Sequence, residues 1–154
     1  MADEATAAAD SPPGGESVGE SGGKSVEELL EVTTSSRLPG ALVIGVRGEV
    51  DAFTHDRLAA AVQAALDDDT PTVVIDLSEV SFFGSPGIAV LIDAETAART
   101  SGQLLRVVVD HRRPVIRPLT IMGLTGYLTL FHRLDDALIA PPDAPGDFLG
   151  ADPN

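Results

Sequence analysis

The chain has 154 residues, of which 44% are hydrophobic, so it is long and apolar enough for one compact domain with a core of its own. Its 24 acidic and 10 basic residues give a net charge of −14, which would repel nucleic-acid phosphates and anionic membrane surfaces, and neither is expected as a direct partner. The absence of cysteine excludes disulfides, thiolate metal sites and thiol chemistry, and no apolar run reaches the roughly 18 residues that span a bilayer.

The two ends of the chain differ in composition from its middle. Residues 1–25 are mostly small, polar or acidic and cannot offset the entropy of ordering, so they are predicted to form a disordered acidic tail. Residues 141–154 are rich in Pro, Gly and Asp and are predicted to form a flexible C-terminal tail. The folded domain is expected over residues 26–140. Because no basic and apolar leader opens the chain, we expect a cytoplasmic protein.

The first half of the domain begins with strands. Two short β-prone runs, residues 29–36 and 41–48, flank a Pro-Gly pair, and this pattern predicts a hairpin. Helical spacing follows over residues 54–66, with Thr54 as the candidate N-cap. The continuous β-branched run over residues 72–77 predicts a strand covered on both faces.

The second half continues the alternation. An apolar stripe over residues 86–99 predicts a helix that Gly102 closes, and residues 104–109 repeat the pattern of a buried strand. Three short elements are then predicted, a helix over 115–122, an edge strand over 128–131 and a last helical turn or two over 135–139. Strands that alternate with helices indicate an α/β layered fold.

A tight corner, Gly84-Ser85-Pro86-Gly87, joins the strand after residue 72 to the helix over 86–99. It places Ser85 at a helix N-terminus, where amides without intrahelical partners and the helix dipole favour negative charge. Serine followed by proline is also a favoured helix start, so Ser85 could serve only as the N-cap. The alternative is that Ser85 accepts a phosphate or contacts a partner directly, and the residues leave both interpretations open.

Three segments together resemble a known family. GEVDAFT (48–54), VVIDLSEVSFFGSPGIAVLI (73–92) and VVVDHRRPVIRPLTIMGLTGYLTLFHRLDDAL (107–138) resemble, in order and spacing, the STAS domain of bacterial anti-anti-sigma factors. The resemblance covers about residues 29–140 and implies a mixed sheet of four or five strands with helices mainly on one face. It also implies a regulator of transcription without enzymatic activity or cofactor, which binds an anti-sigma factor of the GHKL ATPase or kinase type and so frees a sigma factor.

The corner departs from the family pattern. That pattern is typically Asp-Ser-Ser/Thr-Gly, and the anti-sigma factor phosphorylates the second hydroxyl residue. This chain has Gly84 in place of the aspartate and Pro86 in place of the phosphoacceptor, which leaves Ser85 as the candidate phosphorylation site. The residues expected to contact the partner lie at the corner and in the Gly-Glu-x-Asp element before it: Asp51, Phe53, Phe83, Gly84, Ser85, Pro86, Gly87 and Ile88.

Some of these residues have an ordinary structural alternative. Asp51 could simply cap the turn into the helix that begins near Thr54. Among Phe53, Phe82 and Phe83 at least one is expected in the core, and an exposed one would be an interface anchor. A group of arginines beyond the middle of the chain is either solvated charge around a loop or a patch for an acidic partner: Arg106, Arg112, Arg113 and Arg117.

Two other functions deserve comparison with the regulator. A serine at a strand-to-helix corner is similar to the nucleophile of α/β hydrolases, but Phe83 breaks the required Gly-x-Ser-x-Gly. No spacing brings His55, His111 or His132 to Ser85 as a base, so no catalytic residue is predicted. STAS domains also serve as cytoplasmic subunits of membrane transporters, which here would require a separate membrane chain. No Walker-type motif and no metal site is indicated.

Overall fold

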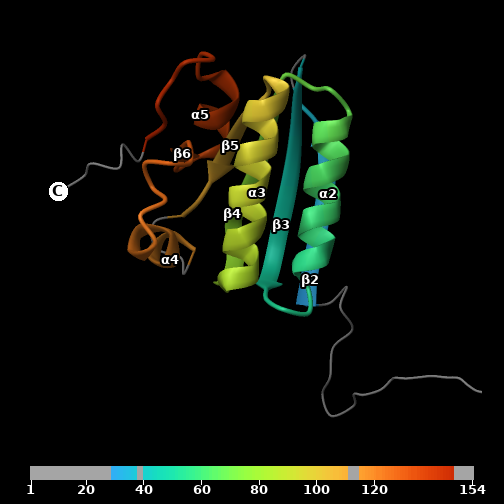
Figure 1. The fold of residues 1–154 in the computed structure, drawn as a ribbon, viewed down its shortest axis with the longest axis vertical. Coiled ribbons are helices and arrows are strands. Elements are labelled where there is room, and N and C mark those ends of the chain that lie inside the picture. The colour runs from blue at the N-terminus through green and yellow to red at the C-terminus, as the bar shows by residue number, and fades with distance from the viewer. Residues whose placement is uncertain (1–28, 38–39, 111–114, 148–154) are drawn as a thin grey trace, which may run out of the picture.

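A computed structural model of the chain describes residues 29–37, 40–110 and 115–147. Its centre is one sheet with the strand order β2-β3-β4-β5-β6, in which β2 is antiparallel to β3 and the other neighbouring strands are parallel (Figure 1). The expected mixed α/β sheet is confirmed, with five strands. In chain order the elements are β2 (Leu30–Ser36), β3 (Ala41–Val50), α2 (His55–Asp67), β4 (Thr72–Phe83), α3 (Ser85–Ser101), β5 (Leu104–Val108), α4 (Ile116–Ile121), β6 (Leu130–Phe131) and α5 (Leu134–Ile139).

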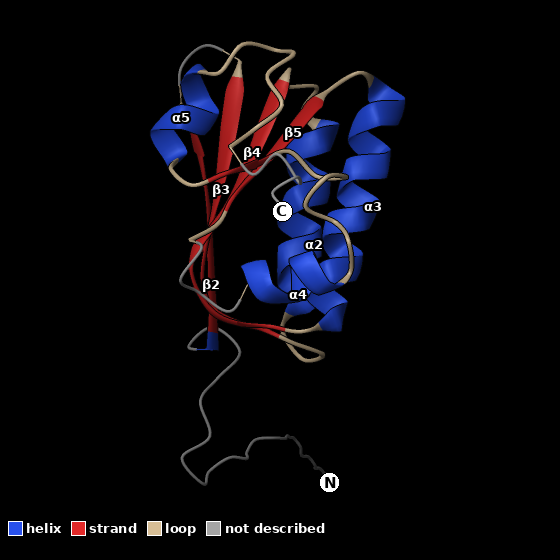
Figure 2. Ribbon diagram, turned by 90° about the vertical axis from the view of Figure 1, so that its left-hand side faces the viewer, coloured by secondary structure: helices blue, strands red, loops and turns tan. Residues whose placement is uncertain are grey.

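The helices lie mainly on one face of the sheet, as expected. Figure 2 shows α2, α3 and α4 on one side and α5 alone on the other. The strand β4 contributes to both cores, because Val73 and Ile75 pack in the larger cluster under α2 and α3 while Val74 packs in the smaller cluster with Ala137 of α5. Burial on both faces explains the continuous β-branched run that predicted this strand.

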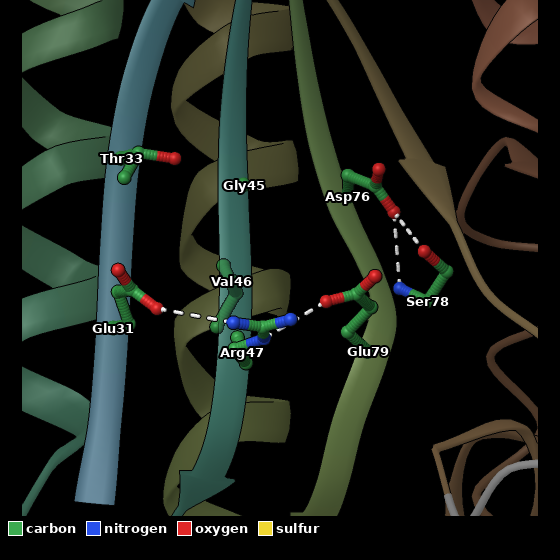
Figure 3. A pocket seen from close by; sticks show the side chains of 8 residues that line it. All are labelled: Glu31, Thr33, Gly45, Val46, Arg47, Asp76, Ser78 and Glu79. Carbon is green, nitrogen blue, oxygen red and sulfur yellow. Dashed lines mark hydrogen bonds and ion pairs between the residues drawn. The ribbon is translucent and has the colours of Figure 1, made fainter. Parts of the chain in front are cut away.

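The strand β4 is longer than the sequence predicted, because it continues beyond residue 77 to Phe83. The register between β3 and β4 shifts twice, and each time β4 has one residue more than β3, as in a β-bulge. Polar residues such as Ser78 and Glu79 end the apolar run without ending the strand. They line a hollow on the sheet (Figure 3), where Ser78 is partly exposed and Glu79 is exposed.

The interpretation of Arg106 as a surface charge is wrong. Its side chain is buried, and its guanidinium donates to the carbonyl oxygens of Ala137 and Pro141 at 2.6 Å each. It also lies over the Phe131 ring, 5.6 Å from the ring centroid. Burial lowers the pKa of Arg106 from its usual value, because the charged form loses hydration. The arginine therefore holds the C-terminal end of α5, whose carbonyls need donors. Arg112 and Arg113 lie outside the described residues.

The chain after α5 returns to the sheet. The Asp147 amide donates to the Leu130 carbonyl at 2.7 Å, and Gly146 at φ +88° approaches the same carbonyl so closely that a Cβ would lie 2.6 Å from it. The first half of the expected C-terminal tail thus lies against β6. The tail expected over residues 1–25 and the last part of the C-terminal one lie outside the described residues.

Candidate partner-binding site

The corner lies where β4 ends beside the end of β3. The Gly84 amide donates to the Val50 carbonyl at 2.9 Å, which fixes the corner to the neighbouring strand. Directly after it, the first turn of α3 packs on the ring of Phe83, a residue only 4% exposed. A Cβ at Gly87 would lie 2.8 Å from that ring and from Val50 Cγ1, so only glycine allows this close approach. The corner is therefore held by the core beneath it.

The helix α3 begins at Ser85, one residue too early for Ser85 to be its N-cap. The N-cap of α3 is Gly84, whose carbonyl accepts from the amides of Gly87 at 2.9 Å and Ile88 at 3.2 Å. Ser85 is already the first helical residue, and no side chain caps this helix. The interpretation of Ser85 as the N-cap is thus wrong. Its side chain is exposed, and its hydroxyl makes no hydrogen bond with any residue that the structure describes.

The expected set of outward amides is also smaller than the sequence suggested. Of the four positions that open an α-helix, Gly84 donates to Val50, Pro86 has no N–H, and Gly87 donates back to Gly84. Only the Ser85 amide has no acceptor among the described residues. Proline has no N–H, and the amides of Gly84 and Gly87 are already bonded within the domain. The helix dipole therefore still favours an anion, but the amides do not form an anion-binding site.

The turn from β3 into α2 lies beside the corner and is held by Asp51. The Asp51 carboxylate accepts from the amides of Phe53 at 2.9 Å and Thr54 at 3.1 Å. Thr54 stands at the N-cap position as predicted, but its buried hydroxyl donates to the Glu49 carbonyl at 2.7 Å and caps no amide of the helix. Asp51 thus holds the turn that precedes α2, and this turn presents Phe53 to solvent, 82% exposed.

The structure divides the residues expected to contact a partner into two groups. Phe83, Gly87 and Ile88 are buried, so they support the surface from below and cannot touch a partner of the folded domain. For these three the expectation of direct contact is wrong, because the first turn of α3 packs inward. Phe53, Ser85 and the partly exposed Asp51, Gly84 and Pro86 lie at the surface. Phe82, 50% exposed, also lies there, and Phe83 is the member of the three phenylalanines that enters the core. The alternation of a longer β4 would have distinguished Phe82 from Phe83.

Neither histidine that the structure describes forms a hydrogen bond with Ser85. His55 Nε2 pairs with Asp56 at 3.1 Å, and its Nδ1 lies 3.2 Å from the Asp51 carbonyl. His132 lies against Asp147, and His111 is outside the described residues. Within the described ranges, no group of three or more His, Cys, Asp or Glu could hold a metal ion. None of the helices described there is long and apolar enough to cross a membrane.

A second candidate surface is the hollow of about 290 Å³ on the open face of β2, β3 and β4 (Figure 3). Arg47 lies between two glutamates, with Nε 3.0 Å from Glu79 and Nη1 3.7 Å from Glu31. Asp76 accepts from the Ser78 amide and hydroxyl at 3.0 and 2.7 Å. The charged groups of this hollow therefore satisfy one another.

Comparisons with known proteins agree with the fold. A family model described as "Mlab, STAS domain" matches residues 33–132. The anti-sigma-F factor antagonist RsfB of Mycobacterium tuberculosis (strain ATCC 25618 / H37Rv) is 35% identical over 114 residues, which cover 74% of this chain and 91% of RsfB.

Solved structures give the same result. The crystal structure of an anti-sigma factor antagonist from Mycobacterium paratuberculosis superposes with a TM-score of 0.66 at 32% identity, over 71% of this chain and 91% of the other. SpoIIAA, a Bacillus cell fate determinant solved in unphosphorylated and phosphorylated forms, shares the fold with TM-scores of 0.55 and 0.53. Its identity is 15 and 16%, over 70% of this chain and 94 and 96% of SpoIIAA.

Proposed function

This chain belongs to the STAS domain family of anti-sigma factor antagonists, and from that premise we propose that it binds an anti-sigma factor of the GHKL ATPase or kinase type and so releases a sigma factor. The binding surface in this proposal is the end of the sheet that carries Ser85. The observation that supports it most directly is the exposed, unbonded Ser85 hydroxyl on a corner that the core holds in place.

The surroundings of Ser85 fit a protein partner better than a small substrate. Phe53 and Phe82 expose large apolar surface near a corner that itself carries no charge. Aromatic side chains on a rigid backbone are typical anchors of protein interfaces, because they bury much area at a small entropic cost. In the proposed complex, the two phenylalanine rings supply most of the affinity, and the state of Ser85 controls whether the partner can bind.

Phosphorylation of Ser85 is the second part of the proposal. A phosphate would add a charge of about −1.5 to −2. Of the amides that open α3, only that of Ser85 itself has no acceptor among the described residues. The charge would therefore stay exposed and would repel or desolvate the partner without any refolding of the domain. Because Pro86 has no hydroxyl, control would act one residue before the position that the family generally uses.

Calorimetry with the anti-sigma factor that co-purifies with the chain from its own cells tests the docking surface. Ser85→Glu is expected to weaken the complex by more than about 1.4 kcal/mol, or tenfold in Kd. Ser101→Glu is the matched control, since it adds the same charge at the exposed C-terminal end of the same helix and is expected to change Kd by less than about twofold. Equal dissociation constants for wild type and Ser85→Glu would refute the docking site.

Mass spectrometry tests the control by phosphorylation. After incubation with the same anti-sigma factor and ATP, we expect a phosphate on Ser85 and none on the Ser85→Ala variant. An unmodified Ser85 would reject this part and leave the docking proposal intact. Co-purification with a membrane permease in place of an anti-sigma factor would favour the transporter alternative over both.

A further inference from the structure

The large apolar side chains that the described part of the chain exposes are unevenly distributed. They are Phe53, Phe82, Ile121, Met122 and Ile139. Phe53 and Phe82 flank the corner, and Ile121 and Met122 stand at the C-terminal end of α4. Figures 1 and 2 show α4 toward the same end of the sheet as the first turn of α3, whereas α5, which ends at Ile139, lies toward the opposite end. The exposed apolar surface therefore gathers at the end that carries Ser85.

The backbone under Ile121 and Met122 is rigid. Leu119 and Val115 fix α4 to the core, where both are fully buried. The helix then ends in a Schellman motif, in which Gly123 at φ +73° donates to the Thr120 carbonyl at 3.0 Å and Leu124 donates to the Leu119 carbonyl at 2.9 Å. Two apolar side chains, 74% and 58% exposed, thus project from a capped turn and not from a loose loop. An anchor held in this way loses little conformational freedom when it binds.

We infer that Ile121 and Met122 form a second anchor for the anti-sigma factor, on the far side of the corner from Phe53. This inference rests on the proposed function, because the occupant is the same partner. The partner surface that fits is apolar at two separate points. It is basic where it meets Phe53, since the exposed acids Glu49 and Asp56 lie near that ring, and acidic beside α4, which carries the exposed Arg117. Contact on both sides of Ser85 would also explain how one phosphate between them could block the whole interface.

The chain offers a closely matched control for this inference. Ile121 and Ile139 are each the last residue of a six-residue helix, and each is 74% exposed. The two residues differ in position, because α4 lies toward the end of the sheet that carries Ser85 and α5 lies toward the opposite end. The full-length variants Ile121→Ala and Ile139→Ala are each titrated by calorimetry into the anti-sigma factor used for Ser85→Glu, and their urea midpoints are compared.

Ile121→Ala is expected to raise Kd about fivefold or more, as truncation of an interface anchor does, and Ile139→Ala to change it less than about twofold. Both variants should keep the urea midpoint of the wild type. If the wild type binds and Ser85→Glu weakens it, but the two isoleucine variants have equal dissociation constants, this inference alone is overturned. It is also overturned if Ile121→Ala instead dissociates a dimer in sedimentation, which would give the patch to a second copy. A wild type that does not bind the anti-sigma factor removes the proposed function itself.

Discussion

The end of the sheet that carries Ser85 and the open face drawn in Figure 3 are two uncovered regions of the same sheet with opposite chemistry. On the open face, Arg47 is paired with glutamates on both neighbouring strands, and Asp76 is paired with Ser78. At the corner end, aromatic rings and an unbonded hydroxyl face water. A partner gains roughly 25 cal/mol for each Å² of apolar surface that it covers. It gains little by replacing ion pairs that are already made, because their desolvation offsets the new contacts.

The strand β4 contributes residues to both regions, and the change in its side-chain pattern explains why the two regions differ in polarity over a short distance. The first bulge of β4 places Ser78 and Glu79 together on the open face. Farther along, Phe82 is half-exposed while Phe83 enters the core. The hollow of about 290 Å³ on the open face is therefore lined by charged groups that pair with one another, whereas the corner end exposes apolar rings. In the proposed complex, the partner covers exposed apolar groups and does not fill the hollow.

The largest expected effect separates the two neighbouring phenylalanines at the corner. Phe83→Ala is expected to lower the free energy of unfolding by about 3–5 kcal/mol, because it empties the space beneath Gly87 and removes a buried ring. Urea denaturation followed by circular dichroism measures this loss. Phe82→Ala, in the half-exposed ring next to it, is the control and should cost less than about 1 kcal/mol.

Binding should show the reverse order for these two variants. Phe82→Ala removes a surface ring and is expected to weaken the anti-sigma factor complex by about 1 kcal/mol or more. Phe83→Ala, measured where it is still folded, acts only through a looser corner. A comparable loss of stability for both variants would mean that Phe83 does not support the first turn of α3.

The second effect concerns the glycine that lets the helix approach the strand. Gly87→Ala is expected to destabilise the domain by about 1–2 kcal/mol, because crowding against the Phe83 ring and Val50 costs about 1–3 kcal/mol and exceeds the gain in helix propensity of up to about 1 kcal/mol. Gly126→Ala is the control, since a Cβ there meets nothing within 4 Å and the backbone is not left-handed. A Gly87→Ala variant as stable as Gly126→Ala would show that the corner can move outward freely.

Periodicity was enough to predict the elements that pack regularly. The β-branched run at residues 72–77, the helical stripe that Gly102 ends and the Pro-Gly hairpin all correspond to elements of the structure, because each repeats one side-chain pattern against one core. The extent of β4 was not predictable in this way. A strand that is buried at one end and open at the other changes its pattern midway, and the bulges shift the alternation twice.

The corner and the turn at Asp51 lie where the sequence predicts them, but their local structure differs in detail. The resemblance located both features. The choice of N-cap, however, depends on whether the carbonyl of Gly84 or that of Ser85 accepts the first hydrogen bond of the helix, a difference of one residue. Burial of Phe83 and Ile88 depends on how deeply α3 settles on the sheet. The burial of Arg106 cannot be predicted from the local sequence, because its guanidinium donates to a carbonyl of α5 that lies 31 residues away in sequence.

The smallest expected effect lies on the open face and sharpens its contrast with the corner. Arg47→Ala removes both ion pairs that cross β2, β3 and β4, yet its side chain and those of its partners are more than half exposed. Exposed pairs contribute little, so the free energy of unfolding should fall by less than about 1 kcal/mol at low salt. At about 1 M salt, where the Debye length is only about 3 Å, most of that difference should disappear.

The same variant decides which of the two surfaces binds. Because Arg47 is already satisfied by Glu31 and Glu79, Arg47→Ala should leave the dissociation constant for the anti-sigma factor within about twofold of the wild type. Arg47→Lys keeps the charge and can pair with the same glutamates, so it separates the loss of the positive charge from the loss of the guanidinium. A tenfold weakening by Arg47→Ala, with Arg47→Lys unaffected, would move the interface from the corner to the open face of the sheet, since only a direct contact with the partner gives a loss of that size.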